Sequence, residues 1–233
     1  MTSAAQVLAD LRARSDAAKA VEMAAYHKTA REFLGVPAAV IDEMARDLRR
    51  EISLSARCDL AQALWDSDVH EACIFAAKLL TQARIRPDDA PVWQIIAGWA
   101  QGFDSWALAD HASIAAAKRL QADPTRLDEV ESWIRAENMW TRRAALVMTL
   151  PWARLPHPKA ADLAVRARVL GWAEGYVRER DWFIQKAVAW WLRDLSRRDP
   201  ATVLAFLDGP GAALKPWARK EALRILQPQI SAP

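Results

Sequence analysis

The sequence is poor in glycine and in cysteine. Its 233 residues include only seven glycines, too few for the many tight turns of a β-sandwich, a β-barrel or a doubly wound α/β fold. None of them forms a G-x-G-x-x-G or G-x-x-x-x-G-K-[ST] loop, so a nucleotide cofactor is not expected. The two cysteines, Cys58 and Cys73, cannot build a disulfide framework.

Metal motifs and long apolar runs are also missing. The four histidines form no H-E-x-x-H pattern and no C-x-x-C pair accompanies them, which argues against a metal site. No stretch of eighteen uncharged apolar residues occurs, and residues 1–20 lack the apolar segment of a signal peptide. We therefore expect a soluble cytoplasmic protein that needs no cofactor and no membrane.

What the sequence does contain is apolar residues at helical spacing. Examples are Leu60 with Leu64 and Ala187 with Trp191, each pair one helical turn apart. No convincing alternating strand pattern appears, and the prolines fall between the periodic stretches, where they end or start helices. The sequence predicts an all-α protein of about ten to thirteen helices, judged from ordinary helix lengths.

Four similar segments suggest a repeat. Each begins with a residue that can cap a helix, and their first residues lie 36, 34 and 43 positions apart: Asp68, Asp104, Asn138 and Asp181. At an offset of 43, Trp133 also aligns with Tyr176, and Arg143 aligns with Lys186. A period near forty residues is typical of HEAT-like α-solenoids. We expect one such domain over residues 1–233, monomeric, with residues 227–233 as a loose tail.

Charge is distributed unevenly along the chain. Residues 1–130 hold 15 basic and 19 acidic residues, a net charge of −4, whereas residues 131–233 hold 17 and 10, a net charge of +7. A basic half is typical of proteins that meet a polyanion, nucleic acid above all. A helical protein with arginine-rich solvated faces would show the same asymmetry.

If the four segments open equivalent helices, aromatic rings and charges share one helix face. This stripe contains Trp106 with Asp110, Trp140 with Arg143, and a third set in the last segment, namely Phe183, Lys186 and Trp190. Rings interleaved with cations suit nucleic acid, since cations bind phosphates and rings contact sugar or base. Packing is the alternative for each ring alone, and it is the expected role of Trp65, Trp93, Trp99, Trp172 and Trp217.

These residues resemble the AlkD family of bacterial DNA alkylation repair glycosylases. The resemblance runs in order over residues 20–226 and rests on a few segments: Tyr26-His-Lys, Phe33-Leu-Gly-Val-Pro37, Asp104-Ser-Trp106-Ala-Leu-Ala-Asp110, Trp140-Thr-Arg-Arg143, Phe183-Ile-Gln-Lys-Ala-Val-Ala-Trp190 and Lys220-Glu-Ala. It implies a HEAT-like solenoid that holds duplex DNA in a basic concave cleft. Its substrates would be purines alkylated at N3 or N7.

The resemblance also implies roles for individual residues. Asp110 would be the catalytic aspartate, and Trp106 and Trp190 the rings that face the deoxyribose. Further DNA contacts are expected from a basic and aromatic set: Tyr26, Trp140, Arg142, Arg143, Lys186 and Arg193. The sequence departs from the common family pattern at Ala107 and Ala109. The role of His111, next to Asp110, is open between titration and packing.

A carboxylate and two indoles suit the chemistry of an alkylated purine. Such a base already carries positive charge, so it leaves without a proton from a general acid. The remaining task is to stabilise an oxocarbenium-like sugar, which a carboxylate does by Coulomb attraction and rings do by cation–π contact. The resemblance implies that the base stays stacked. The alternatives are a non-catalytic protein that binds DNA structure and a helical scaffold for protein partners. A DNA-bound protein would associate with the nucleoid.

Overall fold

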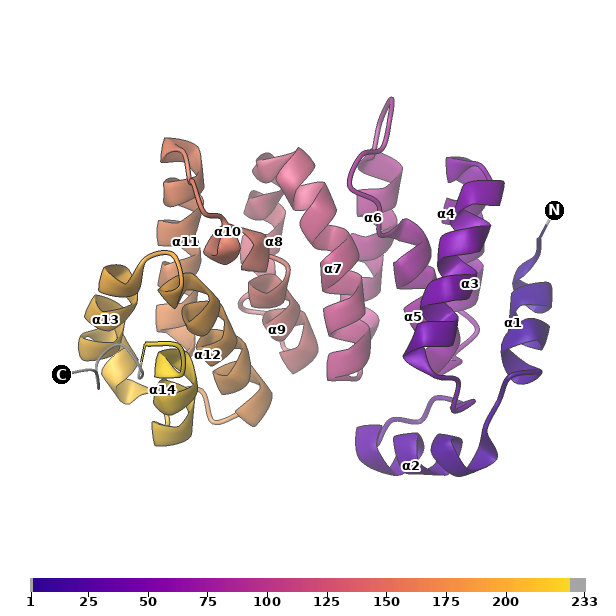
Figure 1. The fold of residues 1–233 in the computed structure, drawn as a ribbon, viewed down its shortest axis with the longest axis horizontal. Helices are drawn as coiled ribbons and strands as arrows, with labels where there is room; N and C mark the ends of the chain where they lie inside the picture. The colour runs from indigo at the N-terminus through magenta and orange to yellow at the C-terminus, as the bar shows by residue number, and fades with distance from the viewer. Residues whose placement is uncertain (1, 227–233) are drawn as a thin grey trace. The chain divides into compact units, whose positions relative to one another are not determined.

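The computed structural model describes residues 2–226, and every regular element in that part of the chain is a helix. The chain forms two compact units, residues 1–124 and 125–233. Fourteen α-helices and three short 3-10 helices lie within the described residues (Figure 1). The predicted all-α class is confirmed, with slightly more helices than expected. The tail predicted to be loose, residues 227–233, lies outside the described residues.

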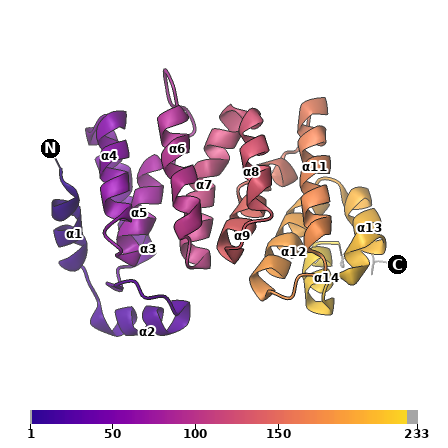
Figure 2. The same ribbon diagram turned by 180° about the vertical axis from the view of Figure 1, so that it is seen from behind.

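The first unit is built around one buried helix. Its elements are α1 (Ala4–Arg12), α2 (Ala17–His27), α3 (Ala38–Glu51), α4 (Leu54–Trp65), α5 (His70–Leu80), α6 (Ala90–Trp99), η1 (Ala100–Gly102) and α7 (Trp106–Ala122). Helices α3, α4 and α7 all pack against α5, every residue of which except Lys78 is buried. Helix α2 lies crosswise to α3, α4 and α5 (Figures 1 and 2).

The second unit is built around α12. Its elements are α8 (Leu127–Trp133), α9 (Met139–Val147), α10 (Leu150–Arg154), α11 (Ala160–Tyr176), α12 (Trp182–Ser196), α13 (Pro200–Asp208), η3 (Pro210–Ala213) and α14 (Pro216–Leu223), preceded by η2 (Pro124–Arg126) at the boundary. Helices α9, α10, α11, α13 and α14 all contact α12, whose Trp191 is fully buried. This unit contains 18 basic and 12 acidic residues, and it includes the whole basic half of the sequence, residues 131–233.

Prolines and one glycine define the ends of helices as the sequence suggested. Pro91, Pro151, Pro200 and Pro216 each stand in the first two positions of a helix, where the missing N–H costs nothing. Gly35, between α2 and α3, has φ of +74°, a conformation that glycine adopts without strain.

Two of the four predicted capping residues are not caps. Asn138 caps α9 and accepts a 2.8 Å hydrogen bond from Trp140 N–H. Asp181 occupies the N-cap position of α12. Helix α5, however, starts after Val69, and α7 starts after Ser105. The carboxylates of Asp68 and Asp104 instead bind Arg31. An unpaired charge on a largely buried guanidinium would cost more free energy than the loss of a helix cap.

The repeat offset of 43 residues is present in the second unit. Trp133 and Tyr176 are the last residues of α8 and α11, and Arg143 and Lys186 are each the fifth residue of α9 and α12. The pairs α8–α9 and α11–α12 are therefore equivalent helix pairs. The single domain expected over residues 1–233 stays a prediction.

Candidate functional site

Trp106 and Asp110 lie on the one accessible face of α7. Ser105 caps the helix by accepting from Leu108 N–H, and Trp106 follows it as the first helical residue. Most other α7 side chains are buried, whereas Trp106 and Asp110 are partly exposed. The predicted spacing of one helical turn thus puts the ring and the carboxylate on the same side of α7, within reach of a ligand from outside.

Two rings contact the indole of Trp106, and two more pack behind them. The ring centre of His27 lies 5.5 Å from that of Trp106, and the ring centre of the exposed Tyr26 lies 6.3 Å away, with the two rings nearly perpendicular. Phe33 and His70 stack behind His27, with ring separations of 5.8 and 4.7 Å from it. We call these five residues the ring cluster. The structure therefore brings Tyr26, a predicted DNA contact, next to Trp106, a predicted sugar-facing ring.

The two histidines of the ring cluster are held neutral. Burial lowers the pKa of His70 to about 3, and nearby His27 and Arg31 lower that pKa further. Burial also lowers the pKa of His27, although the charge of Asp104 opposes this shift. The ring cluster is therefore uncharged at neutral pH.

Two polar clamps hold the ring cluster in place. Arg31 pairs with Asp104 at 2.6 Å and with Asp68 at 2.9 Å, which ties the start of α7 to the loop after α2. The fully buried carboxylate of Glu71 accepts from the backbone N–H groups of Leu34, Gly35 and Val36, at 2.7 to 3.3 Å. Sequence reasoning missed both clamps, because their partners lie more than thirty residues apart.

In the second unit, α12 exposes the predicted stripe. Phe183, Trp190 and Arg193 are partly exposed and Lys186 is exposed, while the intervening residues are mostly buried. The Lys186 ammonium lies over the ring of Trp182, 4.4 Å from its centre. The predicted spacing on this helix is correct, since Phe183, Lys186 and Trp190 share one accessible face.

A network of charges fixes the ring of Trp190. Its Nε1 donates a 3.1 Å hydrogen bond to Asp194, and the guanidinium of Arg154 lies 5.8 Å from the indole centre. Asp194 also pairs with Arg154 at 2.7 Å and with Arg193 at 3.4 Å, and Arg193 pairs in turn with Glu221. Arg193, predicted to contact DNA, therefore also helps to hold Trp190 in place through Asp194.

The arginines of α9 have partners within the second unit. Arg143 is 3% exposed, and its Nη1 donates to the carbonyl of Phe183 at 2.9 Å. Arg142 donates to the carbonyls of Ala136 and Glu137, both at 2.9 Å.

Arg142 also pairs with Glu179 and Asp181. The ring of Trp140 packs on Phe183, 4.6 Å away. Among the predicted cationic contacts, Lys186 is the exposed side chain.

The packing tryptophans are placed as the sequence suggested. Trp65, Trp93, Trp99 and Trp172 are buried, and Trp65 stacks on Trp99 with ring centres 4.3 Å apart. Trp217 is partly exposed and stacks on Trp182, 5.6 Å away.

Residues 2–226 contain no cluster of three or more histidine, cysteine or acidic side chains suited to a metal ion. Within the same residues, no helix is long and apolar enough to cross a membrane.

The match to a known family covers nearly the whole chain. Residues 7–226 match the family described as DNA alkylation repair enzyme. The chain belongs to this family. Membership gives a role in DNA alkylation repair and implies that the protein binds DNA. A comparison with curated proteins found no match.

Solved structures share the fold of this family member. A predicted DNA alkylation repair enzyme from Enterococcus faecalis is 24% identical with a TM-score of 0.75, covering 91% of this chain and 97% of its own. AlkD2 from Streptococcus mutans is 17% identical with a TM-score of 0.60, covering 84% and 91%. The protein smu.31 from Streptococcus mutans UA159 is 17% identical with a TM-score of 0.59, covering 79% and 90%. The predicted HEAT-like repeat fold is thereby confirmed.

Proposed function

We propose that this family member is a DNA glycosylase that removes cationic N3- and N7-alkylated purines, such as 3-methyladenine and 7-methylguanine, from duplex DNA. It acts as a monomer, without a metal or a cofactor, and it leaves the base stacked in the duplex. The observation that carries the proposal is the accessible face of α7, which offers the Asp110 carboxylate one helical turn from the Trp106 indole.

The reaction needs stabilisation of positive charge on the sugar. As the bond from C1′ to the alkylated base breaks, its electron pair goes to the base, which leaves neutral, while the deoxyribose becomes oxocarbenium-like. Asp110 attracts this charge and orients the water that attacks C1′. Trp106 and Trp190 present ring faces to the sugar, each contributing about 0.5 to 2 kcal/mol by cation–π attraction.

The remaining predicted residues bind the duplex in this proposal. Lys186 is exposed and binds phosphate, and Tyr26 contacts the strand beside Trp106. Arg142, Arg193 and Trp140 contact the backbone and also have partners within the second unit. The buried Arg143 shapes the DNA-binding surface through its hydrogen bond to Phe183.

The decisive experiment measures base release. Purified protein is incubated with duplex DNA carrying a single 7-methylguanine, and the single-turnover rate is compared between wild type and Asp110→Asn. We expect Asp110→Asn to lower the rate by about 10²- to 10³-fold, as for the loss of other preorganised electrostatic groups. Asp59→Asn, the same change at an exposed position of α4, is the matched control and should leave the rate unchanged.

Three outcomes would overturn the proposal. Tight, salt-sensitive DNA binding without any base release would show a binding protein that recognises DNA structure. Release of uracil or hypoxanthine as fast as 7-methylguanine would contradict the mechanism. A neutral base carries no positive charge to make it a good leaving group, so the proposed site should release it much more slowly. Weak binding to DNA with capture of a helical peptide would indicate a protein scaffold instead.

A further inference from the structure

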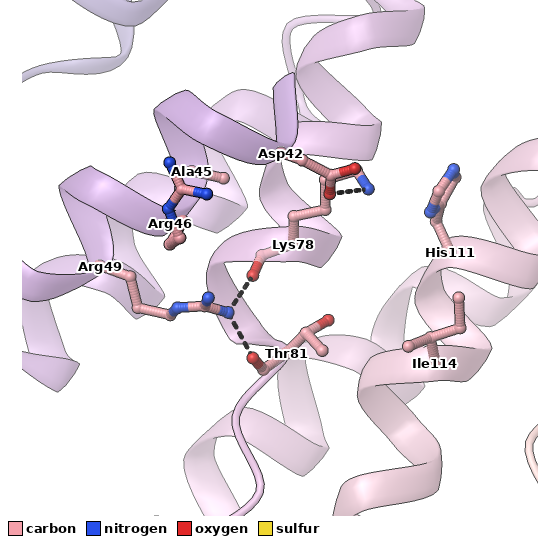
Figure 3. Close-up of a pocket in the computed structure, with 8 residues that line it drawn as sticks. All are labelled: Asp42, Ala45, Arg46, Arg49, Lys78, Thr81, His111 and Ile114. Atoms are coloured by element: carbon pink, nitrogen blue, oxygen red, sulfur yellow. Dashed lines mark hydrogen bonds and ion pairs between the residues drawn. The ribbon is translucent and has the colours of Figure 1, made fainter. Parts of the chain in front are cut away.

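A charged pocket of about 300 Å³ opens between α3, α5 and α7 of the first unit (Figure 3). Arg46 and Arg49 line it from α3, Lys78 from α5, and His111 and Ile114 from α7. None of its lining residues belongs to the predicted site. We call it the α3–α7 pocket.

Lys78 is an unusual residue for its helix. The other ten residues of α5 are buried, and an apolar helix of this kind excludes a charge unless it reaches a partner or water. The Lys78 ammonium reaches into the α3–α7 pocket, where it pairs with the exposed carboxylate of Asp42. The charge is therefore placed at the pocket surface by a rigid, central helix.

Arg49 is held in an extended position at the pocket wall. Its Nη1 donates to the backbone carbonyl of Lys78 at 3.1 Å and to that of Thr81, as Figure 3 shows. These carbonyls belong to the carboxyl end of α5, where a cation is favourable. The guanidinium thus adds fixed positive charge to the pocket.

The pocket has an excess of positive charge. Three cations face one carboxylate, that of Asp42. Burial, with a further effect of the Lys78 charge, lowers the pKa of His111 to about 4, so this imidazole is neutral at neutral pH. A neutral imidazole still donates or accepts a hydrogen bond. A phosphate group matches this charge, and the volume leaves room for it together with water.

The position of the pocket on α7 relates it to the proposed reaction. His111 follows Asp110 directly, and Ile114 lies four residues beyond Asp110 on the same side of the helix. Four residues span about 6 Å of helix axis, which is less than two base-pair steps of duplex DNA at about 3.4 Å each. A phosphate in the pocket therefore lies close to a sugar that Asp110 contacts.

We propose that the α3–α7 pocket binds one phosphodiester of the DNA backbone near the lesion, with Arg46 and Lys78 as its direct contacts. The inference rests on the proposed function, which supplies DNA as the ligand. Asp42 competes with that phosphate for Lys78. His111 completes the pocket as a neutral hydrogen-bonding group.

The first test measures binding to undamaged duplex DNA across a range of salt concentrations. Arg46→Gln and Lys78→Gln should each weaken binding and reduce the slope of log K against log salt by about 1, the loss of one phosphate contact. Arg50→Gln is the matched control. Arg50, like Arg46, lies on α3 and pairs with Asp47, but it does not line the pocket. Asp42→Asn should tighten binding. Circular dichroism checks that each variant folds.

The second test locates the phosphate. Single phosphates on either side of the lesion are replaced in turn by neutral methylphosphonates. At one position within two nucleotides of the lesion, the replacement should remove the difference in affinity between wild type and Arg46→Gln. If no position does so, the pocket does not bind a backbone phosphate and the inference is overturned.

The outcomes separate this inference from the proposed function. If wild type binds duplex DNA but Arg46→Gln and Lys78→Gln behave like Arg50→Gln, the inference fails while the glycosylase proposal stands. If wild type binds no duplex, the proposed function fails as well. Inorganic phosphate serves as a second probe, followed through the NMR signals of the His111 ring. Phosphate binding that duplex DNA does not displace would assign the pocket to a free phosphate compound and overturn the inference.

Discussion

The Nε1 of Trp190 and the Nε of Arg154 donate to the same oxygen of Asp194, at 3.1 and 2.7 Å. This carboxylate oxygen fixes the plane of the indole and places a cation near its face. Because Asp194 is 9% exposed, little water competes for it. The orientation of the ring proposed to contact the sugar therefore depends on a residue that does not itself face the ligand.

Loss of Asp194 should reduce base release more than DNA binding. Asp194→Ala frees the indole, and we expect a single-turnover rate about tenfold lower, because a small misplacement of a reacting group is costly. Affinity for undamaged duplex should change by less than about threefold, as the change removes no phosphate contact. Asp194→Asn keeps an acceptor for Trp190 and should recover part of the rate. Equal losses in rate and affinity would contradict the positioning role.

The buried Glu71 should be important for stability. Glu71→Gln replaces one oxygen with an NH₂ group that cannot accept from Leu34, Gly35 or Val36. Leaving such buried donors unpaired costs about 1 to 3 kcal/mol in the free energy of unfolding, measurable by urea denaturation. Glu43→Gln on the exposed side of α3 should change it by less than about 0.5 kcal/mol. A Glu71→Gln variant as stable as wild type would show that the hydrogen bonds of Glu71 do not stabilise the fold.

Two glycine substitutions should have opposite effects on stability. Gly35 has φ of +74°, and a Cβ there would lie 2.2 Å from the carbonyl oxygen of Asp16. Gly35→Ala is therefore expected to destabilise the fold by more than about 1 kcal/mol. At Gly171, inside α11, an added Cβ would meet nothing within 4 Å, so Gly171→Ala should stabilise by about 0.5 to 1 kcal/mol. Thermal unfolding of both variants tests the pair, and a shift of the same sign in both would contradict this assignment.

Stability should fall as the pH is lowered below neutral. Burial lowers the folded-state pKa of His70 to about 3 from an ordinary value of 6.5. The unfolded chain therefore takes up the proton first as pH falls, and stability is lost from about pH 6.5 downward, toward the folded pKa. The slope per histidine reaches about 1.4 kcal/mol per pH unit.

The measurement is urea denaturation between pH 7 and pH 4. His70→Gln removes the buried group and should make stability depend less on pH over that window. His157→Gln changes an exposed histidine and should keep the wild-type slope. Identical slopes in wild type and His70→Gln would show that His70 titrates normally.

The pocket between α3 and α7 has one signal in the sequence. Lys78 is the single lysine in the largely apolar run His70-Glu-Ala-Cys-Ile-Phe-Ala-Ala-Lys-Leu-Leu. Such a lysine is expected to extend its ammonium group to water or to a polar partner. The sequence does not show which groups the Lys78 ammonium reaches. Arg46 and Asp42 meet Lys78 only because α3 packs against α5.

The sequence by itself determined the helical class, the helix starts at proline, and the shared face of Trp106 and Asp110. Each of these follows from the local geometry of the backbone, in which residues four apart lie on one side of a helix. Tertiary structure alone decided that Asp104 and Asp68 bind Arg31, that Glu71 clamps the loop at Gly35, and that Arg143 is buried against Phe183. Those contacts join residues more than thirty positions apart, so they depend on the path of the whole chain, which no local pattern specifies.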